Sequence, residues 1–160
     1  MNERVPIVLD INGRAHRLAV EPRKILADAI RDDCGLTGTH LGCEHGVCGA
    51  CTILLDGEPV RACLMFAVQA QGREIRTVEG LQSKGSLHPL QKAFIAHHAL
   101  QCGFCTPGFL MLAVGTLERN PDISDAELVE VLSSNLCRCT GYENIVKAVR
   151  AVASELRAAR

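Results

Sequence analysis

The sequence predicts an α+β fold in two parts, a small sheet-bearing domain followed by a domain made of helices. Two observations carry this prediction. The turn dipeptides Asn12-Gly13 and Asp56-Gly57 each separate two β-rich runs, which is a strong hairpin signal. After the polar stretch over residues 80–86, apolar residues recur at helical spacing. We therefore expect one domain over residues 1–79 and a second over residues 80–160.

The first domain is expected to open with a hairpin and a helix. The hairpin strands cover residues 5–11 and 15–20. The helix covers residues 24–33, where one apolar face recurs at helical spacing: Ile25, Leu26, Ala29 and Ile30. The glycine-rich stretch over residues 35–50 indicates a loop.

The rest of the first domain is expected to be β-structure. A second hairpin covers residues 52–55 and 58–62, and a short strand follows over residues 74–77. Together these elements predict a twisted sheet wrapped on one helix.

The second domain is expected to be a small bundle of four helices. Thr106 provides an N-cap and Pro107 the first helical position of the second helix. Ser124, with Glu127 three residues further on, forms a capping box that opens the third helix. The four helices are expected over residues 87–99, 108–119, 124–133 and 142–157.

Composition and charge narrow the class of protein. The chain has 17 basic and 18 acidic side chains in 160 residues, a formal net charge of −1. Nucleic-acid binding needs a basic excess or stripe, so nucleic acid is not expected as a partner. Hydrophobic residues at 48% with charged residues at 22% exclude a disordered chain. Neither a phosphate-binding glycine motif nor a Ser/His/Asp set supports hydrolytic catalysis.

The sequence gives no sign of export or membrane insertion. Its first residues lack the apolar core of a signal peptide. The longest apolar runs, residues 63–68 and 109–114, are far shorter than the ~20 residues that span a bilayer. We therefore expect a soluble, cytoplasmic chain without a transmembrane segment. In a reducing compartment, nine cysteines are expected to hold metal rather than to form disulfides.

Four cysteines of the first domain have the spacing C-x4-C-x2-C-x11-C: Cys43, Cys48, Cys51 and Cys63. The C-x4-C-x2-C part is the plant-type ferredoxin arrangement for a 2Fe-2S cluster. The nearby glycines allow a loop to fold around such a cluster and to aim backbone N–H groups at its sulfurs. Structural zinc is the alternative, although it usually uses two C-x2-C arms with few glycines.

Four more cysteines lie in the second domain, as a C-x2-C pair, 31 intervening residues and a C-x-C pair: Cys102, Cys105, Cys137 and Cys139. Both pairs lie at helix junctions, where exposed backbone N–H groups favour an anion. The spacing alone is compatible with zinc as well as with iron and sulfide.

Three segments carry a specific resemblance: residues 42–52 (GCEHGVCGACT), 101–108 (QCGFCTPG) and 135–142 (NLCRCTGY). In this order they resemble the iron–sulfur subunit of the molybdenum hydroxylases, the xanthine oxidase family. The chain is similar to the separate small subunit of three-subunit bacterial members such as aerobic carbon monoxide dehydrogenase. The resemblance implies an N-terminal ferredoxin-like β-grasp domain and a C-terminal four-helix domain, each with a 2Fe-2S cluster held by one cysteine set.

The resemblance also implies cofactors on partner subunits. A large subunit would bind molybdopterin, often extended as a cytosine dinucleotide, with Gln101 and Cys139 touching the pterin. A medium subunit would bind FAD, or a cytochrome would accept the electrons. The complex would be a dimer of heterotrimers in the cytoplasm, with attachment to the inner face of the membrane as an option.

The implied function is electron transfer from molybdenum through the C-terminal and then the N-terminal cluster to the acceptor. The chain would supply no catalytic acid, base or nucleophile. Two alternatives remain, a zinc-stabilised interaction module and a free-standing ferredoxin, although a soluble shuttle usually carries a strong charge bias. The substrate is left open between carbon monoxide, aldehydes, purines, N-heterocycles and acyl-CoA thioesters.

A few residues near the cysteines have two interpretations. Arg138, between two cysteines, would favour a reduced cluster or would simply be a solvated or interface residue. Phe104, Phe109 and Leu110 are candidates for an apolar interface or for the core. Cys34 lies outside both sets and is expected to be a small buried hydrophobic residue.

Overall fold

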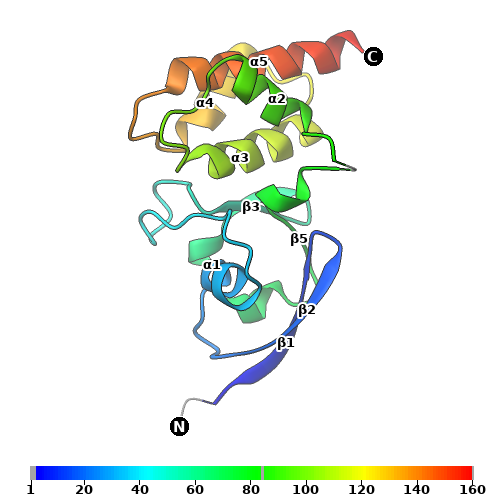
Figure 1. The fold of residues 1–160 in the computed structure, drawn as a ribbon, viewed down its shortest axis with the longest axis vertical. Helices are drawn as coiled ribbons and strands as arrows, with labels where there is room; N and C mark the ends of the chain where they lie inside the picture. The colour runs from blue at the N-terminus through cyan, green and yellow to red at the C-terminus, as the bar shows by residue number, and fades with distance from the viewer. Residues whose placement is uncertain (1–2, 84, 160) are drawn as a thin grey trace.

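The computed structural model describes residues 3–83 and 85–159. A sheet domain and a layer of helices are stacked along the long axis of the molecule, with the N-terminus at the sheet end (Figure 1). Lys84, in the polar stretch expected to separate the domains, lies outside the described residues, as do Met1 and Asn2. Among the described helices, none is both long and apolar enough to cross a membrane.

The sheet has five strands in the order β2-β1-β5-β3-β4. β1 pairs with β5 in parallel, and the other neighbours are antiparallel. Both expected hairpins are confirmed, because Asn12, Gly13, Asp56 and Gly57 all have φ between 51° and 81°, as type I′ turns require. The strands are β1 (Val5–Ile11), β2 (Arg14–Val20), β3 (Thr52–Leu55), β4 (Glu58–Arg61) and β5 (Glu74–Arg76).

The helix of the sheet domain is shorter and more irregular than expected. It consists of α1 (Leu26–Asp28) and a wider π-helical turn over Ala29–Asp33. It begins late because Ile25 is extended and forms an isolated bridge with Phe66. The π turn closes where the Cys34 N–H donates to the carbonyl of Ala29, five residues back. Three short 3-10 turns were not predicted: Ala62–Leu64, Ala67–Ala70 and Val78–Gly80.

Four helices form the second layer, as expected: α2 (Pro89–Ala96), α3 (Thr106–Arg119), α4 (Asp125–Ser133) and α5 (Tyr142–Ala158). The N-cap prediction at Thr106 was wrong. Thr106 is itself the first helical residue and Cys105 the N-cap, because the Thr106 N–H already donates to the carbonyl of Gly103. Pro107 is tolerated there because the first turn has no intrahelical acceptors for its N–H groups.

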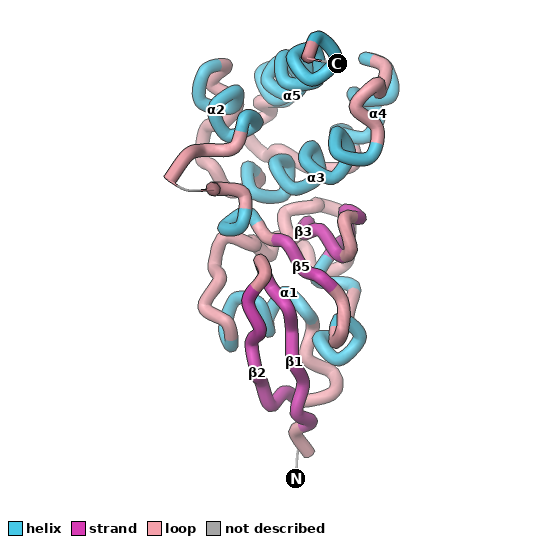
Figure 2. Tube along the Cα trace, turned by 90° about the vertical axis from the view of Figure 1, so that its right-hand side faces the viewer, coloured by secondary structure: helices cyan, strands magenta, loops and turns pink. Residues whose placement is uncertain are grey.

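The two layers meet along α3 and β3. In both views α3 lies between the sheet domain and the other helices (Figures 1 and 2). All four residues of β3 are buried, because the strand is covered on both faces. Ile53 and Leu55 belong to the core between the sheet and α1, whereas Leu54 belongs to the core of the helices. The relative position of the two layers is therefore fixed by packing.

The capping box at the start of α4 is formed as the sequence predicts. Ser124 Oγ accepts from the N–H of Glu127, and the Glu127 carboxylate accepts from the N–H of Ser124. We expect Ser124→Ala to lower the free energy of unfolding by about 1 kcal/mol in a denaturant titration. Ser133→Ala, at the other end of the same helix, is the control and should change it by less than about 0.5 kcal/mol. Equal effects would contradict a capping role.

Candidate metal centres

The first cysteine set lies where the glycine-rich loop meets the second hairpin. Cys51 directly precedes β3, and Cys63 lies in the 3-10 turn after β4. Pairing of the two strands brings these cysteines together, and the N–H of Ala62 donates to the carbonyl of Cys51 at 3.2 Å. Both are buried, and their thiols are neighbours. Burial raises the pKa of the Cys51 thiol to about 12.

The other two cysteines of this set form a second, more exposed pair in the loop. The N–H of Cys48 donates to Cys43 Sγ at 3.3 Å, and the two thiols are neighbours. The hydrogen bond from the Cys48 N–H is the largest cause of the lowered pKa of Cys43, which is about 6. The loop reaches this shape through left-handed residues, Glu44 at φ 56° and Gly46 at φ 86°.

The second set repeats the arrangement of two thiol pairs. Cys102 and Cys105 precede α3, while Cys137 and Cys139 lie between α4 and α5. The thiol of Cys102 neighbours that of Cys139, and the thiol of Cys105 neighbours that of Cys137. The backbone N–H of Phe104 lowers the pKa of the exposed Cys102, whereas burial raises the pKa of Cys105 to about 12.

The pairing of the thiols bears on which metal group each cysteine set could hold. Tetrahedral zinc needs four ligands around one ion, whereas a 2Fe-2S cluster divides four cysteines between two irons. Two pairs of free thiols in each set therefore suit the binuclear group better than zinc.

The two sets open onto a common cleft of about 420 Å³ between the layers. Cys43 and Cys48 line it from one side, and Cys102, Cys105 and Cys137 from the other. The N–H of Leu136 donates to the carbonyl of Cys48 at 2.9 Å. Because Leu136 directly precedes Cys137, a single hydrogen bond joins the backbone of one set to that of the other.

Arg61 and Asn135 fix this junction, and neither was predicted from the sequence. The Arg61 guanidinium donates to Thr52 Oγ1 at 2.5 Å within the sheet domain and to the carbonyl of Ser134 at 2.9 Å in the helical layer. Asn135 is 1% exposed, and its Nδ2 donates to the carbonyl of Gly49 at 3.3 Å. Only the three-dimensional structure brings these residues together, because 73 positions separate Arg61 from Ser134.

We expect Arg61→Lys to lower the free energy of unfolding of the full chain by about 1.5 kcal/mol. Lysine keeps the charge but lacks the planar fork that bonds two partners at once. Arg73→Lys is the matched control, because the Arg73 guanidinium bonds the exposed Asp56 carboxylate within the sheet domain. Its effect should stay below about 0.5 kcal/mol. Chemical denaturation of both variants tests the difference. Equal losses of unfolding free energy would contradict the role of Arg61 in joining the two domains.

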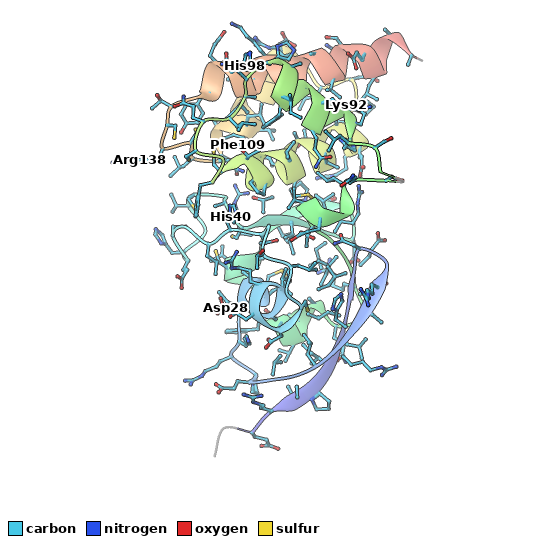
Figure 3. All side chains as sticks on the ribbon, in the orientation of Figure 1. Asp28, His40, Lys92, His98, Phe109 and Arg138 are labelled. Atoms are coloured by element: carbon cyan, nitrogen blue, oxygen red, sulfur yellow. The ribbon has the colours of Figure 1, made fainter. Side chains whose placement is uncertain are left out.

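The structure separates the residues that had two interpretations. Phe109 and Leu110 are core residues, whereas Phe104 is 48% exposed and stacks on His40 at 4.9 Å between ring centroids. Figure 3 shows Phe109 within the helical layer and His40 below it in the sheet domain. Arg138 is exposed and lines the cleft.

Two predicted site residues meet at the surface. Gln101 Nε2 donates to the carbonyl of Cys139 at 3.1 Å, and Gln101 is exposed. Cys34 is half-buried against the core of the sheet domain, and burial raises the pKa of its thiol to about 11. Its apolar surroundings agree with the interpretation as a small hydrophobic residue, although its burial is incomplete.

Comparison with known proteins gives matches over nearly the whole chain. Residues 9–77 match the 2Fe-2S iron–sulfur cluster binding domain, and residues 77–150 match a second 2Fe-2S binding domain. The nicotine 6-hydroxylase small subunit of Paenarthrobacter nicotinovorans is 61% identical over 148 residues, which are 92% of this chain and 89% of that one. The caffeine dehydrogenase subunit gamma of Pseudomonas sp. (strain CBB1) is 57% identical over 149 residues, covering 91% and 89%.

A solved structure is similarly close. The crystal structure of quinoline 2-oxidoreductase from Pseudomonas putida 86 contains a chain that superposes with a TM-score of 0.91. It is 55% identical in sequence, and 97% of each chain is covered. The comparisons give no support to a zinc-stabilised interaction module or to a free-standing ferredoxin.

Proposed function

The chain belongs to the iron–sulfur subunits of the molybdenum hydroxylases, and from this premise we propose that its eight paired cysteines hold two 2Fe-2S clusters. The membership makes it the electron-transfer component of a heteromeric oxidoreductase, with the substrate converted on a partner subunit. When bound, each cluster would supply one-electron transfer. The observation that carries the proposal is that each domain gathers four free cysteines as two neighbouring pairs, with members of both sets lining one cleft.

Each thiol pair would hold one iron of a 2Fe-2S cluster. In the sheet domain these pairs are Cys43 with Cys48 and Cys51 with Cys63. In the helical domain they are Cys102 with Cys139 and Cys105 with Cys137. Backbone N–H groups already point at sulfur, from Cys48 to Cys43 and from Gly141 to Cys137, which stabilises thiolates at those positions. We place the boundary between the two domains at residues 79 and 80.

The C-terminal cluster faces the molybdenum-binding partner. Cys102 and Gln101 are exposed, and Gln101 is bonded to the backbone of Cys139, so this ligand set reaches the surface. Gln101 and Cys139 are the residues that contact the pterin of a molybdopterin held by that partner. The amide of Gln101 offers a donor and an acceptor for such a planar polar ring.

The relatives suggest the rest of the assembly. The similar proteins are termed a small subunit and a subunit gamma, which supports a multi-subunit enzyme. The assembly is a dimer of heterotrimers in the cytoplasm with a large molybdopterin subunit and a medium FAD subunit, unless a cytochrome accepts the electrons. Nicotine, caffeine and quinoline, in the names of the relatives, are all N-heterocycles, so the substrate of the complex is an aromatic N-heterocycle.

Metal analysis combined with EPR tests the proposal on the chain purified with its partners. Two clusters require about four irons and four sulfides per chain, and two rhombic signals after reduction with dithionite. One zinc per chain with no EPR signal would overturn the electron-transfer function. Four irons with a single signal of one spin per chain would overturn the assignment of two independent clusters.

A further inference from the structure

Tyr142 is the only tyrosine of the chain and the first residue of α5. Its side chain turns back toward the second cysteine set, and its Oη accepts a hydrogen bond from the N–H of Cys137 at 2.9 Å. The hydroxyl therefore occupies a backbone donor of a candidate cluster ligand. The ring lines the cleft between the two cysteine sets.

The two residues before Tyr142 donate hydrogen bonds to the carbonyl and the thiol of Cys137. The carbonyl of Cys137 accepts from the N–H of Thr140 at 3.0 Å, and its Sγ accepts from the N–H of Gly141 at 3.4 Å. Thr140 has a left-handed φ of 59°, which closes the turn. Residues 140–142 thus make hydrogen bonds to the carbonyl, the thiol and the N–H of Cys137.

The ring of Tyr142 is held by packing, so the position of its hydroxyl is defined. It makes an edge contact with Phe109, with centroids 6.4 Å apart and planes at 73°. Phe109 is fully buried in the core of the helices. The contact with the buried Phe109 therefore helps to direct the hydroxyl at Cys137.

We propose that Tyr142 is a positioning residue that keeps the reduction potential of the C-terminal cluster low by holding the Cys137 N–H away from sulfur. This inference rests on the proposed function, because it concerns the cluster assigned to that set. N–H donors directed at cluster sulfurs stabilise the more negative, reduced state and raise the potential. Tyr142 occupies one such donor with its hydroxyl oxygen, which disfavours an added electron.

An EPR-monitored redox titration of the purified complex carrying Tyr142→Phe tests this inference. The variant keeps the ring and its contact with Phe109 but frees the Cys137 N–H. We expect the midpoint potential of the C-terminal cluster to rise, with a change in its one-electron reduction equilibrium of up to about tenfold, or about 59 mV. The N-terminal cluster is the internal control and should keep its potential.

Asn144→Ala is the matched control variant. It removes another neutral hydrogen bond of the first turn of α5, from Asn144 Nδ2 to the carbonyl of His98, and leaves Tyr142 in place. A general loosening of this turn would shift the potential in both variants, whereas the proposed effect is confined to Tyr142→Phe. An unchanged or lowered potential in Tyr142→Phe, with full iron content, overturns the inference.

Biosynthetic replacement of tyrosine by 3-fluorotyrosine gives a second measurement if Tyr142→Phe fails to assemble. In this chain it alters Tyr142 alone, because no other tyrosine exists. The fluorinated phenol is a weaker acceptor, so we expect a smaller shift in the same direction, and no shift would again overturn the inference. Failure of the proposed function would be distinguishable, because iron and both EPR signals would then be missing from the unsubstituted complex.

Discussion

Cys137→Ser is expected to remove the EPR signal of the C-terminal cluster and to reduce turnover of the complex to background, while the N-terminal signal remains. Cys137 is 8% exposed and neighbours the half-buried Cys105, so a thiol lost from this position is not readily replaced by another ligand. Serine offers a hard oxygen in place of the soft thiolate that iron–sulfur clusters require. Iron content should fall by about half, because one of two clusters is lost.

The same substitution at a cysteine outside both sets is the matched control. Cys34→Ser removes a half-buried thiol from the sheet domain, and we expect both EPR signals and turnover to persist. Loss of both signals in Cys137→Ser would show that the two clusters do not assemble independently. Retention of both signals would remove Cys137 from the ligand set.

The hairpins and the four helices could be predicted because each depends on local sequence, whereas the two cysteine sets remain a prediction from spacing and resemblance. Asn12-Gly13 and Asp56-Gly57 fix their turns through residues that tolerate positive φ. The capping box at Ser124 depends on residues only three positions apart. The spacing of the cysteines likewise needs no knowledge of the fold.

Features that depend on contacts between distant segments could not be predicted. The helix expected over residues 24–33 starts late because Ile25 bridges to Phe66, which is 41 positions away. β3 reads as a plain apolar run, and only packing reveals that its two faces belong to different cores. The roles of Arg61 and Tyr142 have the same origin, because a side chain that bonds a remote backbone group leaves no periodic signal.

The two layers pack closely at Gly108 of α3. A Cβ added to Gly108 of α3 would collide with the carbonyl oxygen of Gly49 and come within 3.1 Å of Ala50 Cα. Both obstacles are backbone atoms of the loop that carries Cys48 and precedes Cys51. A methyl group at Gly108 can therefore be accommodated only if α3 moves away from the first cysteine set.

We expect Gly108→Ala to lower the free energy of unfolding by about 2–3 kcal/mol, although alanine is intrinsically the better helix former by about 1 kcal/mol. Gly115 lies seven residues further along α3. A Cβ added there would meet side-chain atoms, Leu54 Cδ2 at 2.6 Å and Pro59 Cγ at 2.7 Å. The Leu54 methyl can rotate away and the Pro59 ring can only change its pucker, so Gly115→Ala should also cost stability, but less than a clash with backbone atoms. Chemical denaturation of both variants measures which one loses more unfolding free energy. The magnetic interaction between the reduced clusters should weaken only in Gly108→Ala. A stabilised Gly108→Ala variant would mean that α3 and the loop do not pack this closely, because helix propensity alone would then decide the sign.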